Sequence, residues 1–584
     1  MRILLLGETG REPGYEAWHA SLVNAGVPFD AIAAAEQSRP VTIISSAGAV
    51  RYQALIVIKE GLLDGLLDFE QRSALKCAER DGGLRRLSAY AYPGPQYGLN
   101  PPSWSGRLDD VIARLTPRGL EVFPYLRGPV PIDPGTWGYL ATPEPRGCFE
   151  PLLLGPSGSS LLGVWCDGDG REQMVQTFDA NSAQVHGQLL RQGILAWLTR
   201  GVHVGYQRNY LTVHVDDVLL PNHGWDPERH VTGGGMLRMS AQDALRTARW
   251  SQTRGIRLDF ACNGAGSERH AREIGASRDP LLDALLTERD AFGWVNHTFE
   301  HQDLDGASQA AIENEITRNL EWAAEHGIEF EPDVLITGEH TGLANLTARP
   351  PRDENPNLAP ALNARGIRFV ACDASRPYPS CGSGPDSPAV PAGTPFVSGG
   401  TLAVPRYPTA LAHDVATADQ LIDRLRQSGG ATVGSWRQVV SAEARRIFAK
   451  VLSNDPRPHF FHQSNLMATV VDPDTVRSSL LCELLDSVLD LYHSLIEPSM
   501  PLVQPTLSEI GRHLLRHQAG RHAWASGRLE VYREGTAVTV VNRAGSPLEL
   551  PLTGAPAGEN YGGIRSAWFQ APPGTTVLQS ASPS

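Results

Sequence analysis

The feature that most constrains this fold is the alternation of short apolar runs and longer amphipathic segments between residues 206 and 515. The short runs are rich in Val, Ile and Leu, and apolar residues recur at helical spacing in many of the segments between them. Repeated strand–helix units of this kind form a parallel sheet or a barrel. We predict strands at 210–215, 256–261, 293–295, 333–337, 367–372 and 459–461, and helices at 241–254, 307–326 and 474–495.

The segments on either side differ in composition, which indicates further domains. At 584 residues the chain is several times longer than a typical domain. Buried strand and helix patterns near the N-terminus predict an open α/β domain of the Rossmann or flavodoxin type, and short runs broken by Pro and Gly predict β-sandwich-like modules. We therefore expect a multi-domain protein of mixed α/β and β class. The expected domains are open α/β at 1–125, a β-rich accessory module at 126–205, the strand–helix region at 206–515 and a β-rich segment at 516–584.

Aromatic residues in the β-rich module suggest one possible role for it. Tyr125, Trp137, Tyr139 and Trp165 could form a platform on which sugar rings stack. Aromatic side chains in strands also pack commonly in cores, and the sequence leaves both interpretations open.

Composition excludes several classes of protein. The formal net charge is −13, from 51 Lys and Arg against 64 Asp and Glu, so we expect no nucleic-acid partner. No Cys-x-x-Cys pair occurs among the seven cysteines, so neither a zinc ribbon nor a thioredoxin-like site is indicated. No apolar run approaches the ~18 residues of a membrane span, and the N-terminal run of four is too short for a signal peptide. Localisation and oligomeric state stay open.

Polar residues follow the predicted strands, and this coincidence is the strongest functional signal in the chain. In parallel sheets and barrels, functional groups gather at the carboxyl ends of the strands. The residues at these ends include Asp216 and Asp217, Asn296 and His297, Gly338 to His340, Asp373, and His462.

The first candidate group is the pair Asp216 and Asp217, which follows the strand at 210–215. Adjacent side chains at a strand end point in different directions, so one carboxylate can bind a cation while the other acts as a base. The alternative is a helix N-cap beside a surface aspartate.

The second candidate group contains histidines. His297 and His301 are spaced i, i+4 and can converge on one metal ion if the segment turns into a helix; alternatively, both are solvated. Together with one aspartate they would form a two-His, one-Asp set that leaves positions open for water and substrate. His462 ends a strand and could act as a general acid. His459 competes for this role but begins the strand, and a purely structural His462 is the other alternative.

These motifs resemble those of a known family. Val213-His-Val-Asp-Asp217 resembles the T-F-D-D motif of polysaccharide deacetylases with the NodB-homology fold. His297-Thr-Phe-Glu-His301 resembles their H-[ST]-x-x-H motif, and Phe460-Phe-His462 resembles their L-x-H motif. The detailed match is closest to the galactosaminogalactan deacetylase branch, the family 18 carbohydrate esterases, and its bacterial relatives. The resemblance covers residues of about 205–515, and it extends to the flanking segments only loosely.

The resemblance implies a function for each motif. It implies a distorted (β/α) barrel in which Asp217, His297 and His301 hold Zn²⁺ or another divalent metal. Asp216 would be the general base and His462 the general acid in the N-deacetylation of an N-acetylhexosamine-containing exopolysaccharide. The partner would be this acetylated amino-sugar polymer, and the module at 126–205 would bind carbohydrate.

Two departures from the family pattern affect the site. His214 stands where the family has threonine. The R-x-P-Y motif is missing after the strand at 333–337, where Gly338-Glu-His-Thr-Gly342 stands instead, and an Arg376-Pro-Tyr378 string occurs one strand later. We assign the arginine that supports the base to Arg376, with Arg406 as the second candidate; Glu339 or His340 could fill the gap.

Two other functions fit the same residues. One is a non-catalytic carbohydrate-binding protein with a decayed barrel, for which the missing R-x-P-Y motif argues. The other is a metal-dependent amidohydrolase that acts on a small amide. A nucleotide enzyme is disfavoured, because Gly7-Glu-Thr-Gly10 matches no phosphate-binding fingerprint.

Overall fold

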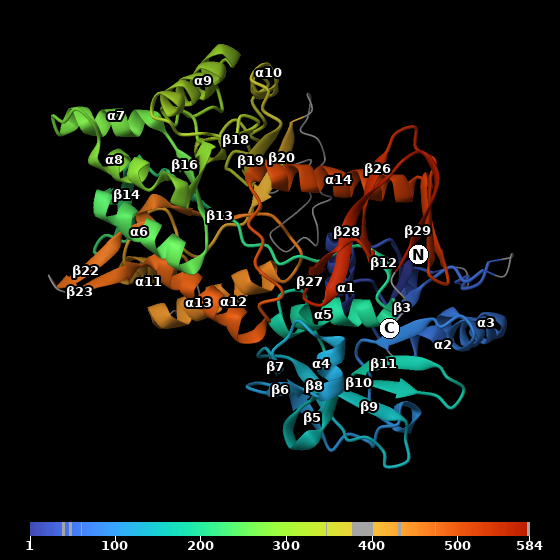
Figure 1. The fold of residues 1–584 in the computed structure, drawn as a ribbon. Coiled ribbons are helices and arrows are strands. Elements are labelled where there is room, and N and C mark those ends of the chain that lie inside the picture. The colour runs from blue at the N-terminus through green and yellow to red at the C-terminus, as the bar shows by residue number, and fades with distance from the viewer. Residues whose placement is uncertain are drawn as a thin grey trace.

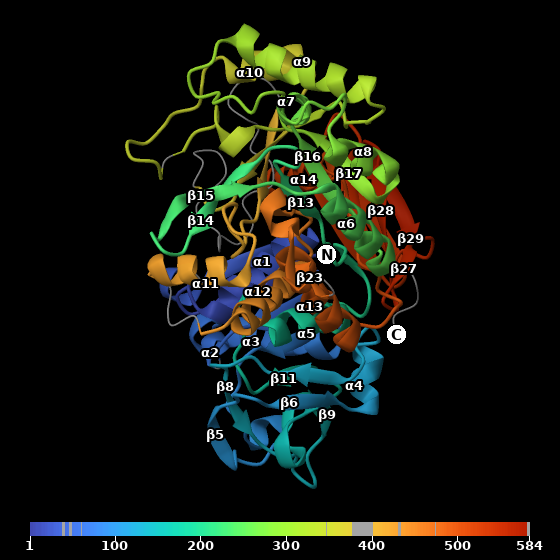
Figure 2. The ribbon, with the colours of Figure 1, turned by 90° about the vertical axis from the view of Figure 1, so that its left-hand side faces the viewer.

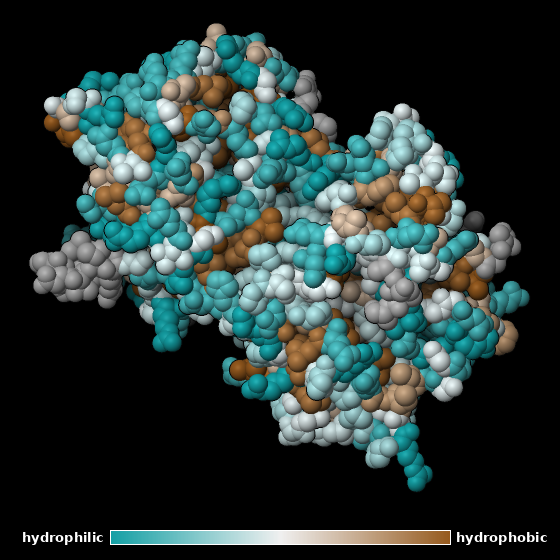
Figure 3. Space-filling view, viewed as in Figure 1, coloured by the Kyte–Doolittle hydropathy of each residue, from teal (hydrophilic) through white to brown (hydrophobic). Residues whose placement is uncertain are grey.

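The computed structural model describes residues 1–37, 41–45, 49–59, 61–345, 347–376, 401–429, 434–472 and 475–580. One lobe contains the strands and helices of the central region, a second contains a large N-terminal sheet, and the C-terminal strands lie beside both (Figure 1). The face shown in Figure 3 is largely hydrophilic, with separate apolar patches. In the described part of the chain, no helix combines the length and apolarity that crossing a lipid bilayer requires.

A nine-stranded sheet contains strands from both N-terminal segments. Its order is β2-β1-β3-β4-β11-β10-β9-β6-β7. The strands from β2 to β11 pair in parallel, and those from β11 onward pair antiparallel. The expected boundary at 125 falls inside this sheet, and the division into domains stays a prediction. The strands are β1 (Ile3–Gly7), β2 (Phe29–Ala33), β3 (Ala54–Val57), β4 (Arg85–Ser88), β6 (Ile112–Leu115), β7 (Pro129–Pro131), β9 (Phe149–Leu154), β10 (Ser160–Cys166) and β11 (Glu172–Gln176).

The central region forms two parallel sheets. One has the order β17-β16-β13-β21 and the other β18-β19-β20. A parallel bridge between Tyr407 and His459 connects the end of β20 to β21. The parallel strands that we predicted are therefore present, in two sheets rather than in one continuous closed sheet. Their bounds are β13 (Val213–Asp216), β16 (Leu258–Cys262), β17 (Phe292–Asn296), β18 (Val334–Ile336), β19 (Phe369–Asp373), β20 (Leu402–Arg406) and β21 (His459–His462).

Most predicted central elements agree with the structure to within a few residues. Helix α6 (Ala241–Arg254) has the predicted bounds, and α9 (Gln309–Glu325) lies within the predicted range. Helix α13 (Leu480–Leu495) starts later than predicted, because Thr475–Ser479 forms strand β23. Strand β20 was not predicted; it contains Pro405, which β20 tolerates as the last strand in its sheet.

The C-terminal β-rich segment that we predicted forms parts of two sheets, ordered β24-β25-β29 and β12-β26-β28-β27. Apolar side chains from both sheets, including Val531, Val540 and Leu552, share one buried cluster. Helix α14 (Leu507–Ala525) packs against β26 and also contacts β20, so it links this segment to the central sheets. The strands are β12 (His203–Val204), β24 (Leu529–Glu534), β25 (Ala537–Asn542), β26 (Leu548–Thr553), β27 (Glu559–Tyr561), β28 (Ile564–Ala571) and β29 (Gly574–Gln579).

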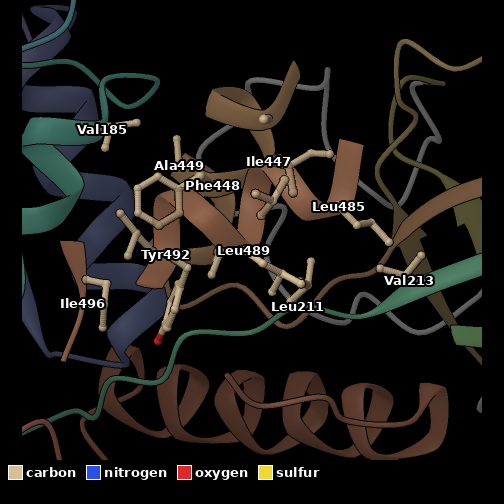
Figure 4. Packing of buried hydrophobic residues seen from close by; sticks show 14 of the residues in the cluster. Val185, Leu211, Val213, Ile447, Phe448, Ala449, Leu485, Leu489, Tyr492 and Ile496 are labelled. Atoms are coloured by element: carbon tan, nitrogen blue, oxygen red, sulfur yellow. The ribbon is translucent and has the colours of Figure 1, made fainter. Parts of the chain in front are cut away.

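One large apolar core ties the lobes together and thereby positions the candidate site. Helix α5 (Val185–Leu198) contacts β4 and β7 of the N-terminal sheet, α12 (Trp436–Val451) packs against α5, and α13 packs against α12. Phe448 of α12 and Tyr492 of α13 lie at their junction, with rings 6.2 Å apart (Figure 4). The same cluster includes Val213 and Val215 of β13, the strand that precedes the two aspartates.

We expect Phe448→Ala to lower the free energy of unfolding by about 3–5 kcal/mol, because it opens a cavity beside Tyr492 in this core. Urea denaturation followed by fluorescence measures the change. Phe69 is the control, because its side chain is 79% exposed and its removal should cost less than about 0.5 kcal/mol. Equal effects of the two variants would contradict this account of the core.

Candidate metal and catalytic site

Asp217, His297 and His301 come together at the carboxyl ends of β13 and β17. One possible ligand atom from each of the three lies within 4.8 Å of those of the others. Asp217 Oδ1 lies 3.3 Å from His297 Nε2 and 3.2 Å from His301 Nε2. These separations suit three donors around one ion with bonds of about 2.0–2.2 Å. Asp217 and His297 are buried, and His301 is half-buried.

The donor atoms are oriented as a metal site requires. His297 Nδ1 bonds the carbonyl oxygen of Ile336 at 2.9 Å, which leaves Nε2 facing Asp217. Within the described residues, Asp217 Oδ1 is buried and accepts no hydrogen bond of acceptable geometry. A buried carboxylate oxygen is costly to leave unpaired, so the residues present fit a bound cation.

Backbone strain is concentrated around these residues. Ten non-glycine residues of the described chain have positive φ, and five of them surround the site. Strained backbone of this kind clusters at functional sites. The five are Asp217 at 60°, Thr298 at 65°, His301 at 60°, Glu339 at 50° and His340 at 58°.

Buried amides support the strained loop that carries the histidines. Asn296 Oδ1 accepts the Thr298 N–H at 3.0 Å, and Asn319 Nδ2 donates to Asn296 Oδ1 at 2.8 Å. Asn263 Nδ2 donates to the carbonyl oxygen of Thr298 at 2.9 Å. A Cβ on Gly338 would lie 2.9 Å from the His301 ring, so this position needs glycine.

Asp216 is held by a buried arginine. Arg406 Nη1 and Nη2 donate to Asp216 Oδ1 and Oδ2, each at 2.8 Å, and both residues are buried. The guanidinium lies 4.6 Å from the Phe460 ring centroid, and Nη2 is 3.2 Å from His340 Nε2. Burial alone would raise the pKa of Asp216, but Arg406 outweighs it and holds that pKa well below its usual range.

The carboxylate contact expected of Arg376 is made by Arg406. Arg376 Nη1 instead donates to the carbonyl oxygen of Glu339 at 2.9 Å, and its Nε lies 3.3 Å from Asp373 Oδ2. Arg406 ends β20, the strand that sequence reasoning missed, and this end brings its side chain to Asp216. The rest of the Arg-Pro-Tyr string, Pro377 and Tyr378, lies outside the described residues.

His462 lies beside the aspartates. It pairs with Asp216 in the parallel register of β13 and β21, at the carboxyl ends of both strands. Burial lowers its pKa, while the charges of Asp217 and Asp216 oppose that shift. The competing His459 begins β21, and its ring packs 5.5 Å from that of Tyr407.

His214, which replaces the family threonine, lies inside the sheet below Asp216. It is fully buried, and its Nε2 is 3.8 Å from Asp259 Oδ2. Burial and the charge of Arg406 lower its pKa to about 3, so the ring is neutral at pH 7. His214 therefore adds no charge next to the Asp216–Arg406 ion pair.

Comparisons with known proteins bear on these motifs. Residues 272–519 match the family described as the Agd3 deacetylase domain, a segment that includes His297, His301, Arg406 and His462. No curated protein sequence matches the chain significantly.

Solved structures extend the likeness to the whole chain. The crystal structure of Agd3, a carbohydrate deacetylase, matches with a TM-score of 0.82 and 18% identity, over 100% of this chain and 99% of that one. A family 4 carbohydrate esterase from Streptomyces lividans matches with a TM-score of 0.19 and 13% identity, over 42% of this chain and 87% of that one. The Bc1960 peptidoglycan N-acetylglucosamine deacetylase matches with a TM-score of 0.24 and 11% identity, over 51% and 90%.

The two low TM-scores do not establish a shared fold, whereas the match to the Agd3 structure does. The expected resemblance is thereby confirmed: residues 272–519 match the Agd3 deacetylase domain family, and the whole chain has the fold seen in the Agd3 crystal structure.

Proposed function

We propose that this protein is a metal-dependent deacetylase that removes N-acetyl groups from N-acetylhexosamine units of a polysaccharide and releases acetate. The observation that carries the proposal is the convergence of three metal-type donors, Asp217, His297 and His301, beside an ion-paired aspartate and a histidine. The match to a carbohydrate deacetylase domain supports the reaction class.

Asp217, His297 and His301 would hold the metal, which we take to be zinc. When bound, a divalent ion polarises an amide carbonyl and lowers the pKa of water. The set Asp–His–His suits such an ion because it combines imidazole nitrogens with one carboxylate oxygen.

Asp216 would accept the proton of the attacking water, and His462 would donate a proton to the leaving amine. Arg406 keeps Asp216 ionised and fixes the orientation of its carboxylate. A carboxylate with so low a pKa is a weak base. It can therefore accept the proton only from water whose own pKa has been lowered. The lowered pKa of His462 makes its protonated form a stronger proton donor.

The two parallel sheets would be two arcs of the distorted (β/α) barrel. The Tyr407–His459 bridge connects β20 to β21, and His297 Nδ1 bonds Ile336 of β18 across the gap between β17 and β18. In this arrangement residues 206–515 form the deacetylase domain.

The β-rich part at 126–205 would bind the polymer through exposed aromatic rings. Trp137 is 46% exposed on β8 (Trp137–Leu140), which pairs with β5 (Trp104–Arg107). The rings of Tyr92 and Tyr139 lie 5.1 Å apart. Aromatic rings of this kind stack on apolar sugar faces, whereas Tyr125 is buried and would not take part.

We expect the protein to release acetate from oligomers of N-acetylgalactosamine or N-acetylglucosamine, to lose this activity with a chelator and to regain it with zinc. An acetate assay on each oligomer measures the release and identifies the sugar. If the protein binds metal but releases acetate from neither oligomer, the result would favour the hydrolase of a small amide. Neither release nor metal binding would favour a non-catalytic carbohydrate-binding protein.

Two substitutions separate the roles of Asp216 and the metal ligands. Asp216→Asn should keep the metal but lower kcat by about 10²–10⁴-fold, the usual contribution of a general base. His297→Ala should lose both metal and activity, because it removes a ligand. Metal analysis of the purified variants and acetate release measure these outcomes. Full activity of Asp216→Asn would exclude it as the base.

Loss of Arg406 should bring the titration of Asp216 into the acid limit of activity. The charge of Arg406 lowers the pKa of Asp216, and activity needs this carboxylate ionised. Arg406→Gln should raise the pKa of Asp216 by about 1–3 units, because burial then acts unopposed, and kcat/KM should fall at a higher pH than in the wild type. Metal content is measured in parallel to show that the site is intact.

Arg376→Gln is the matched control for this pH profile, because Arg376 contacts Glu339 and Asp373 rather than Asp216. We expect its acid limb to stay at the wild-type position. If the acid limb of the pH profile shifted in Arg376→Gln but not in Arg406→Gln, Arg376 would again be the arginine that supports the base.

A further inference from the structure

We propose that Asn222 is a positioning residue for metal binding: its amide NH₂ occupies one oxygen of Asp217 and reserves the other oxygen for the metal. The inference rests on the metal site of the proposed function. It concerns a residue that belongs to none of the motifs considered above.

The two oxygens of Asp217 lie in different surroundings. Asn222 Nδ2 donates to Asp217 Oδ2 at 3.0 Å. Asp217 Oδ1 faces the Nε2 atoms of His297 and His301 and, among the described residues, accepts no hydrogen bond. The oxygen that would bind the ion is thus the one that Asn222 leaves free.

A second amide fixes the orientation of Asn222. Gln463 Nε2 donates to Asn222 Oδ1 at 2.6 Å and to the carbonyl oxygen of Leu237 at 2.9 Å. Gln463 Oε1 accepts the backbone N–H of Met239 at 2.6 Å. A backbone N–H can only donate and a carbonyl can only accept, so the amide of Gln463 has one possible orientation. That orientation leaves Asn222 Oδ1 as acceptor and turns its NH₂ toward Asp217.

The hydrogen bonds from Gln463 to Asn222 and from Asn222 to Asp217, here called the relay, connect parts of the site that are distant in sequence. Asn222 begins β14 (Asn222–Asp226), and its register partner Leu237 ends β15 (Val231–Leu237). The two strands form a hairpin beside α11 (Ala418–Gln427), as Figure 2 shows. Gln463 directly follows His462 and is fully buried. The buried amide of Gln463 thus connects both strands of the hairpin, and through Asn222 it reaches Asp217, the proposed metal ligand.

The physical benefit is a carboxylate that needs no reorientation. A free carboxylate rotates and offers either oxygen, whereas a hydrogen bond on Oδ2 holds Oδ1 toward the histidines. Partners of metal ligands typically contribute 10–100-fold to metal affinity. A neutral amide does this without adding charge next to the ion pair of Asp216.

The test is the affinity for zinc and cobalt, measured by competition with a chromophoric chelator, in Asn222→Leu and Gln463→Leu. Each variant should bind 10–100-fold more weakly than the wild type. The visible absorption spectrum of bound cobalt should also change, because Asp217 can then present either oxygen. Since both substitutions break one relay, the double variant should bind about as weakly as the worse single variant.

Asn100→Leu is the matched control. Like the amide of Gln463, its amide donates to two oxygens, those of Thr142 and Pro143, but it lies outside the central sheets. We expect wild-type metal affinity and an unchanged cobalt spectrum. The relay is refuted if Asn222→Leu binds metal like this control, or if the effects of the two single variants add in the double variant.

Metal affinity is read without any sugar, so the two proposals can fail separately. A wild type that binds zinc but releases no acetate contradicts the proposed function, and the relay still stands or falls by the affinities. A wild type that binds neither zinc nor cobalt overturns both.

Discussion

The buried ion pair between Arg406 and Asp216 is the interaction on which the site depends. Asp216 ends β13 and Arg406 ends β20, so the pair joins the two parallel sheets. Removing both charges from water costs several kcal/mol per ion, and two parallel hydrogen bonds offset this only in part. An apolar pair of similar volume often stabilises a core equally well. Stability alone therefore does not explain the pair, whereas holding a carboxylate ionised beside the proposed metal donors would.

Strain at the strand ends completes the arrangement. Asp216 stays in the extended backbone of β13, and Asp217 at once adopts a φ of 60°. This reversal points two adjacent carboxylates at different partners: one at Arg406, the other at His297 and His301. Non-glycine residues rarely adopt such backbone, and each instance costs of order 1–3 kcal/mol. The core around Val213 and Val215 and the buried amides near Thr298 supply the stability that offsets this strain.

Where the signal was local, the sequence indicated the parallel strands and the candidate site. Strand ends followed by Asp, His or Asn indicated the parallel sheets and the donors Asp217, His297 and His301. Arg406 was only the second candidate for the arginine beside the base, because its strand was not predicted and the pairing of β20 with β19 is what places it at Asp216. Asn222 was invisible for another reason, since its partner Gln463 lies 241 positions away. Likewise, local patterns do not show that β4 pairs with β11 across the expected boundary at residue 125.

The two aspartates illustrate how one dipeptide supports two kinds of chemistry. Both are buried, so each needs a partner for its charge. Asp216 has a permanent cation in Arg406, which leaves it ionised but only weakly basic. Asp217 has a neutral donor on one oxygen and two imidazoles facing the other, a surrounding that a divalent ion completes. The division follows from the partners rather than from the carboxylates, because the two side chains are chemically identical. The proposed metal ligand and the proposed base would therefore be distinguished by Asn222 and Arg406, the residues that hold the two carboxylates in place.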